Sequence, residues 1–290
     1  MIPSEIIKKI RLIEIKTKHI VNNIFGGEYH SAFKGMGIEF SEVRQYYPGD
    51  DIRGIDWNVT ARYGTPYIKK YNEERELTVI LMIDVSASGF YGSGSMLKSD
   101  LMIEIGSILS FSAIKNNDKV GLLLFSDKIE KYIPAKKGKS HALRVIREII
   151  YHRADNTGSD IGSALNHLQK VLKRKSIIFI LSDFWCNNYY KQMKRMNRKH
   201  DLINVQILDS TEINFPTMGL MKFHDVESKL SFWINTSNKN HIHKISERVD
   251  TNIKILNAFC KRNKIDLIRI NEYDGYIDPL IKFFNSRTKK

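Results

Sequence analysis

The chain has 290 residues, 42% of them hydrophobic and 27% charged, which is the composition of a globular protein with one large domain or two small ones. Its 46 basic and 32 acidic residues give a net charge of +14, which favours acidic partners. No apolar run approaches the roughly 20 residues of a membrane span. Cys186 and Cys260 form neither a disulfide framework nor a zinc motif. We therefore expect a cytoplasmic protein without a transmembrane segment.

The N-terminal part divides into two stretches. Residues Met1 to Asn23 mix Ile and Leu with Lys and Arg, which predicts an amphipathic helix packed on the protein's own surface; a helix lying on a membrane is the alternative. Gly35 to Tyr71 is dense in glycine, aromatic and charged residues, so we expect a loop-rich segment braced by ion pairs. We predict that residues 1–76 pack on a main domain formed by residues 77–290.

Beyond residue 76, strand-like and helix-like patterns alternate. The expected strands are Leu77–Val85, Val120–Phe125, Lys128–Ile133, Ser176–Leu181, Leu202–Leu208 and Ile265–Ile270, with a hairpin at Met218–Phe223 and Lys229–Ile234. The expected helices are Leu97–Ile114, Ser140–His152, Ile161–Leu172, Tyr189–Lys199, Ile242–Arg262 and Ile277–Asn285. Such alternation predicts an α/β fold, a doubly wound and mostly parallel sheet flanked by helices.

Oxygen-bearing side chains follow the first strand of this domain. Asp84, Ser86 and Ser88 stand on alternate residues where the buried run Leu77 to Ile83 ends. In an open α/β sheet, ligands bind in the crevice outside the carboxyl ends of the strands. Because hard divalent cations take oxygen ligands, this stretch suggests a metal site.

Two further loops supply oxygens at the same predicted edge. Ser159 precedes the helix Ile161 to Leu172, with Thr157 as a substitute ligand, and Asp183 ends another strand. The predicted ligand set is Asp84, Ser86, Ser88, Ser159 and Asp183. The expected ion is Mg²⁺, with Ca²⁺ and Mn²⁺ as alternatives. Each residue also has a plain structural interpretation, because serines cap helices and turns and an aspartate can simply end a strand.

The chemistry of this set favours binding over catalysis. Most of the ligands are neutral hydroxyls, and only two carboxylates offset the ion's charge, so the metal stays electrophilic and can accept a carboxylate from outside. The sequence offers no evident general base or activated nucleophile beside it. We therefore expect a protein that is not an enzyme.

With these residues in view, the chain resembles the von Willebrand factor A-like family, whose metal-ion-dependent adhesion site (MIDAS) has the pattern of Asp84-x-Ser86-x-Ser88, Gly158-Ser159-Asp160 and Asp183. More closely, it resembles the bacterial DUF58 family. That resemblance rests on Gly-x-Gly-x-Glu-Phe from Gly35, Arg-x-Tyr-x-Pro-Gly-Asp-Asp-x-Arg from Arg44, Ile-Asp-Trp-x-x-Thr-Ala-Arg from Ile55, and Glu-Glu-Arg-Glu-Leu from Glu73. One departure is Ser159, where the family usually has threonine.

The resemblance implies a non-enzymatic, metal-dependent protein-binding module. Its implied partner is a MoxR-type AAA+ ATPase, or a client of that ATPase, in chaperone-like assembly, with the partner offering an Asp or Glu to the metal. Two alternatives remain open. One is a Mg²⁺-dependent phosphohydrolase or nuclease that uses Asp84 and Asp183. The other is a basic nucleic-acid-binding protein, whose affinity would fall steeply with salt.

Overall fold

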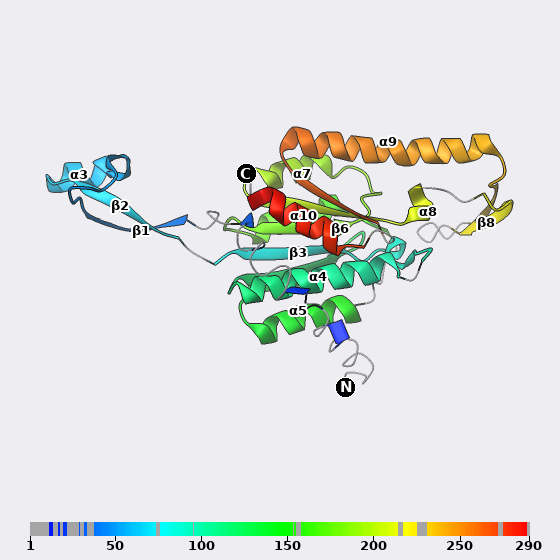
Figure 1. The fold of residues 1–290 in the computed structure, drawn as a ribbon, viewed down its shortest axis with the longest axis horizontal. Coiled ribbons are helices and arrows are strands. Elements are labelled where there is room, and N and C mark those ends of the chain that lie inside the picture. The colour runs from blue at the N-terminus through cyan, green and yellow to red at the C-terminus, as the bar shows by residue number, and fades with distance from the viewer. Residues whose placement is uncertain are drawn as a thin grey trace.

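The computed structural model describes residues 12–13, 17, 20–21, 29, 32–33, 38–73, 76–94, 96–152, 154, 158–213, 217–224, 231–271 and 275–288. A six-stranded sheet forms the centre of the molecule (Figure 1). In spatial order its strands are β10 (Asp266–Asn271), β7 (Asp201–Leu208), β6 (Ile177–Ser182), β3 (Thr78–Asp84), β4 (Lys119–Phe125) and β5 (Ile129–Lys136). Only β5 runs antiparallel to its neighbour. The predicted α/β class with a mostly parallel sheet is confirmed.

Helices cover both faces of the sheet, because successive side chains of a strand point to opposite sides. One face of β3 carries Val79, Leu81 and Ile83 into a core with α4 (Lys98–Lys115), α5 (Lys139–Tyr151) and α10 (Ile277–Thr288). The other face carries Ile80 and Met82 into a second core with α6 (Ile161–Val171), α7 (Tyr190–Asn197) and α9 (Lys239–Asn263). These strands are buried on both faces, which explains their nearly continuous apolar sequences.

The N-terminal residues contribute to the first of these cores. The helix expected over Met1 to Asn23 lies mostly outside the described residues, but Ile13, Ile20 and Val21 are buried in the core with α4 and α5. Tyr29 and Phe33 join the same core. These described residues pack on the main domain. None of the helices in the described part of the chain is long and apolar enough to cross a membrane.

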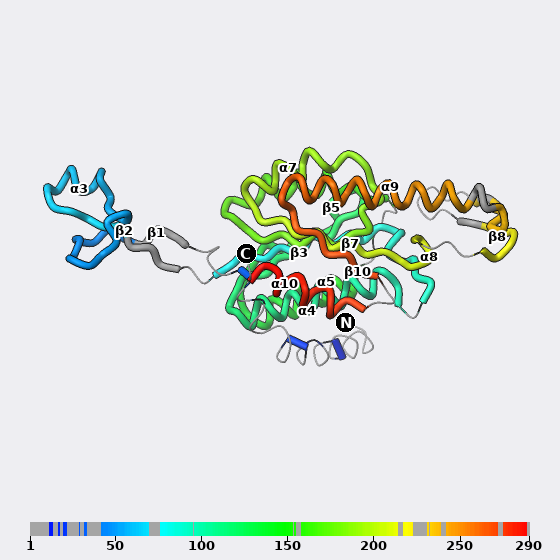
Figure 2. The backbone as a smooth tube through the Cα atoms, turned by 45° about the horizontal axis from the view of Figure 1, so that its top comes forward, coloured from blue at the N-terminus to red at the C-terminus, as the bar shows by residue number. Residues whose placement is uncertain are grey.

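Residues 38–73 differ from the loop-rich segment that we expected. They form an antiparallel hairpin of β1 (Ile38–Gln45) and β2 (Tyr67–Glu73), joined by a short 3₁₀ helix η2 (Ile52–Gly54) and by α3 (Trp57–Tyr63). The hairpin extends away from the sheet instead of packing on it (Figures 1 and 2). Its charged residues pair within it, as Arg44 does with Asp50 at 2.7 Å. Charged residues stand along both strands, and a bulge between Phe40 and Glu42 breaks the alternation of β1, so the sequence resembles that of a loop.

A second, smaller hairpin lies at the other end of the molecule. It consists of β8 (Leu220–His224) and β9 (Ser231–Asn235), close to the position predicted for it, and precedes α9. The first hairpin leads into the amino end of β3, whereas β8 follows the carboxyl end of β7. Figure 1 accordingly shows the two hairpins at opposite ends of the central sheet.

Strand β4 lies close to both of its neighbours, β3 and β5, at Gly121. A Cβ atom at this position would lie 2.9 Å from the backbone nitrogen of Ala135 and 2.9 Å from Cδ1 of Ile80. We expect Gly121→Ala to destabilise the protein by about 1–3 kcal/mol, because strand backbone cannot move aside without breaking the ladder. Urea denaturation measures this change. Gly158→Ala is the control, since its Cβ would meet only Cβ of Asp127 at 3.6 Å; equal losses for the two variants would contradict the prediction.

Asp118, just before β4, predicts a pH dependence of stability. Burial raises the pKa of its carboxyl to about 6, although the backbone N–H of Leu77 donates to it at 2.9 Å. Folding raises this pKa, so the protonated carboxyl stabilises the folded state. That stabilisation is complete below about pH 4 and is lost as the pH rises through 6. We expect Asp118→Asn to remove a decline of about 1–2 kcal/mol in unfolding free energy over that interval. Denaturation at several pH values tests this, with the exposed Asp250→Asn as a control that should keep the decline.

Candidate metal centre

The predicted site residues come together at the carboxyl ends of β3 and β6, which are neighbours in the sheet. After β3 the chain enters α4 on one face, and after β6 it enters α7 on the other face. The loops therefore diverge and leave a crevice between them, the usual ligand position in a doubly wound sheet.

Asp84 is the last residue of β3 and lies at the centre of this arrangement. One of its carboxylate oxygens, Oδ2, accepts hydrogen bonds from the hydroxyls of Ser159 at 2.7 Å and Ser182 at 2.8 Å. The other, Oδ1, accepts from the backbone N–H of Ser86 at 3.0 Å. Burial and the nearby negative charge of Asp183 raise the pKa of Asp84, while the hydrogen bonds from Ser159 and Ser86 oppose that shift. The carboxylate thus connects the loop after β3, the loop before α6 and the end of β6.

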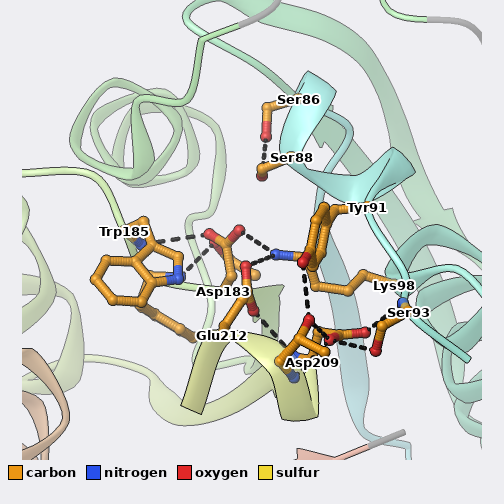
Figure 3. Close-up of polar contacts among 12 residues, drawn as sticks. Ser86, Ser88, Tyr91, Ser93, Lys98, Asp183, Trp185, Asp209 and Glu212 are labelled. Atoms are coloured by element: carbon orange, nitrogen blue, oxygen red, sulfur yellow. Dashed lines mark hydrogen bonds and ion pairs between the residues drawn. The ribbon is translucent and has the colours of Figure 1, made fainter. Parts of the chain in front are cut away.

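The hydroxyls of Ser86 and Ser88 lie together 3.1 Å apart, on the short 3₁₀ helix η3 (Ala87–Phe90) and the residue before it. Ser86 occupies the N-cap position of η3, yet its side chain makes no capping hydrogen bond. Its hydroxyl is almost fully buried. The interpretation of Ser86 as a plain cap is therefore wrong, and its side chain turns toward Ser88 (Figure 3).

Ser159 is likewise not used as a helix cap. The N-cap of α6 is Asp160, whose side chain accepts from the backbone N–H of Ser163 at 2.9 Å. The backbone N–H of Asp160 donates to the carbonyl of Ser126 at the end of β4, at 2.8 Å, and this bond holds the loop over the sheet edge. These contacts leave the hydroxyl of Ser159 for Asp84. Thr157, the predicted substitute ligand, lies outside the described residues.

Asp183 faces a buried ammonium group that could not be predicted from the sequence pattern. Its Oδ2 accepts from Nζ of Lys98 at 3.0 Å, and its Oδ1 accepts from the backbone N–H of Trp185 at 3.3 Å. Nζ of Lys98 also donates to Glu212 at 2.8 Å (Figure 3). Burial alone would lower the pKa of Lys98, but Asp183 and Glu212 raise it above its ordinary value, so the group stays charged.

Glu212 belongs to the segment that follows β7 and lies beside the site. It lies on the short helix α8 (Ser210–Ile213) after β7, and its Oε2 accepts from the backbone N–H of Asp209. Asp209 in turn accepts from the backbone and hydroxyl of Ser93, at 2.8 and 2.7 Å. Although burial opposes it, the hydrogen bonds from Thr211 and Ser93 hold the pKa of Asp209 far below its usual range. The loop after β3 and the loop after β7 are therefore tied together.

A signal for part of this network was present in the sequence. Asp209 and Glu212 directly follow the strand β7, so the rule that selected Asp84 and Asp183 also applies to them. Lys98 had no such signal, because a lysine at the start of a helix ordinarily lies in solvent. Its burial depends on carboxylates that are 85 and 114 residues away in the sequence.

The donor set fits a hard cation. Hydroxyl and carboxylate oxygens from three loops converge at the crevice, and two of the hydroxyls have no capping role. The described residues contain no group of three or more His, Cys, Asp and Glu that could hold a metal. Any ion bound here would therefore depend on serine hydroxyls for most of its protein ligands, and a soft or nitrogen-preferring ion would find few.

A cleft of about 1260 Å³ opens beside these residues. Of the predicted ligand set, Asp84 and Ser86 line this cleft, together with Phe90, the first turns of α4 and the end of α5. Phe90 is about half exposed. The site therefore borders a space that can admit a side chain from another molecule.

Comparison with known proteins identifies relatives of most of this chain. The family model described as "Protein of unknown function DUF58" matches residues 42–253. The uncharacterized protein Rv1480 of Mycobacterium tuberculosis is 28% identical over 222 residues, which are 76% of this chain and 70% of the relative. The uncharacterized protein YeaD of Bacillus subtilis is 23% identical over 115 residues, 40% of this chain and 27% of YeaD.

Two solved structures align with much of the chain. BatB from Bacteroides thetaiotaomicron aligns with a TM-score of 0.48 and 14% identity, covering 74% of this chain and all of BatB. The VWA domain of SpRpn10 aligns with a TM-score of 0.40 and 10% identity, covering 71% of this chain and 94% of that domain.

The hydrogen bonds of Ser182 predict that it supports the site. Ser182 is fully buried; its hydroxyl donates to Asp84 and accepts from the backbone N–H of Phe184 at 3.0 Å. We expect Ser182→Ala to reduce the unfolding free energy by about 1–3 kcal/mol, because that N–H loses its partner. The control is Ser110→Ala, since the buried Ser110 hydroxyl donates only to a carbonyl of its own helix. Urea denaturation of both variants should show the larger loss for Ser182→Ala, and the reverse order would contradict the assignment.

Proposed function

We propose that this chain, which belongs to the DUF58 family, is a protein-binding module. Its binding to its partner depends on a divalent cation. The observation that carries the proposal is the convergence of serine hydroxyls from separate loops around the buried carboxylate of Asp84, with Ser86 and Ser159 free of any capping role. Turns and caps alone do not require this convergence.

The residues that would hold the ion are those of the predicted set. Ser86, Ser88 and Ser159 would contribute hydroxyl oxygens, and Asp84 and Asp183 would contribute carboxylates, directly or through water. Mg²⁺ is the ion we expect, because it prefers oxygen ligands; Ca²⁺ and Mn²⁺ share that preference. When bound, the ion supplies an electrophilic position for a carboxylate of the partner.

Binding is better supported than catalysis. Burial raises the pKa of the Cys186 thiol, which lies near the site, to about 11, so this group stays protonated at neutral pH and is a poor nucleophile. Lys98 is held as an ammonium by two carboxylates and does not act as a base. We therefore propose a site that is not enzymatic, in preference to the phosphohydrolase or nuclease alternative.

The partner we propose is a MoxR-type AAA+ ATPase or its client, as resemblance to the family implies. The partner would present an Asp or Glu to the ion, and the adjacent cleft gives that side chain a route to Asp84 and Ser86. The net charge of +14 would speed encounter with an acidic face. Both cysteines are free thiols, in keeping with the proposed cytoplasmic location.

The proposal predicts that partner capture requires both the ion and Asp84. In pull-downs with the MoxR-type ATPase of the same genome, we expect capture in Mg²⁺. The captured amount should fall at least about tenfold in EDTA, which removes the ion, and with Asp84→Ala, which removes a ligand carboxylate. Ser159→Thr keeps the hydroxyl and should retain capture, whereas Ser159→Ala should not. Capture of the ATPase that is unchanged by EDTA and by Asp84→Ala would refute the metal-bridged mechanism.

A further inference from the structure

Lys98 occupies a position that stability alone would disfavour. It is the first residue of α4, where the positive end of the helix dipole repels a cation. Its side chain is only 2% exposed, although lysine is almost never fully buried unless it is paired. Two carboxylates, Asp183 at 3.0 Å and Glu212 at 2.8 Å, offset both penalties.

The ammonium of Lys98 lies where it competes with a bound cation. It contacts Oδ2 of Asp183, one of the two carboxylates in the proposed ligand set. A positive charge within hydrogen-bond distance of a metal-ligating carboxylate neutralises part of that carboxylate's attraction and repels the ion directly. Lys98 therefore neutralises negative charge of Asp183 that would otherwise attract the ion.

Glu212 gives Lys98 a second partner that does not belong to the ligand set. Its carboxylate is fixed by the backbone N–H of Asp209 at 2.9 Å, and Asp209 is fixed by Ser93. The hydroxyls of Tyr91 and Thr211, 2.8 Å apart, join the same two loops. An ammonium displaced from Asp183 would thus remain paired with Glu212 instead of being left alone in a buried environment.

We propose that Lys98 is a built-in counter-ion that stands in for the divalent cation at Asp183, weakens the binding of that cation, and is retained by Glu212 when the cation binds. This inference rests on the proposed function and concerns the regulation of the same site. The affinity for the ion is then set by how Lys98 is shared between Asp183 and Glu212.

The test measures Mg²⁺ affinity by isothermal titration calorimetry, with Mn²⁺ binding followed by electron paramagnetic resonance. We expect Lys98→Met to bind Mg²⁺ at least about tenfold more tightly than the unaltered protein, because a like charge is removed. Glu212→Gln should bind Mg²⁺ at least about threefold more weakly, because Asp183 is then the one remaining carboxylate that pairs with the Lys98 ammonium in this pair of contacts. Lys98→Gln, which keeps a hydrogen-bond donor without the charge, should also bind more tightly and carries the test if Lys98→Met does not fold.

Lys119→Met is the matched control. Lys119 pairs with Glu76 at the start of β4, at the opposite end of the sheet, so its removal changes the net charge equally and should alter affinity by less than about twofold. A purely structural role for Lys98 would weaken binding in both the Lys98 and the Glu212 variants. Opposite directions for the two therefore support the proposal.

Two results would overturn the inference in distinguishable ways. If the unaltered protein binds Mg²⁺ and neither Lys98 variant binds it more tightly, Lys98 is no competitor and the proposed function stands. If neither the unaltered protein nor any variant binds Mg²⁺ or Mn²⁺, the metal-dependent function fails and the inference fails with it.

Discussion

The buried carboxylate of Asp84 is the contact on which the rest of the site depends. It accepts hydrogen bonds from the loop after β3, the loop before α6 and the last residue of β6, and so it fixes three segments that the chain brings together from distant positions. A buried carboxylate is tolerated only when such donors surround it. Because the hydroxyls of Ser159 and Ser182 donate to this carboxylate, Asp84 also determines where those two hydroxyls point.

The sequence was most informative where a residue's surroundings follow from regular structure. The strands of the main sheet could be predicted because burial on both faces demands continuous apolar residues, and Asp84 and Asp183 followed because strand ends meet at one edge. β1 and β2 were missed, because a bulge between Phe40 and Glu42 breaks the alternation of β1 and charged residues interrupt both strands. The role of Lys98 could not be predicted, since it depends on Asp183 and Glu212, which only the folded chain places beside it.

The structure also shows whether two serines act as helix caps, a question that the sequence left open. Serine before a helix is ordinarily a cap, and the sequence could not tell a cap from a ligand at Ser159. The capping bond comes from Asp160, the next residue, so the hydroxyl of Ser159 is not the cap and donates to Asp84 instead. A similar distinction holds at Ser86, whose hydroxyl is turned toward Ser88 while the η3 helix goes without a side-chain cap.

The β1–β2 hairpin has a steric consequence. It leads into the amino end of β3, whereas Asp84 and its neighbouring loops lie at the carboxyl end, so the length of the sheet separates them (Figure 1). Trp57 and Tyr63 on the hairpin are each 68% exposed. A side chain that enters the crevice therefore approaches the end of the sheet farthest from these aromatic rings.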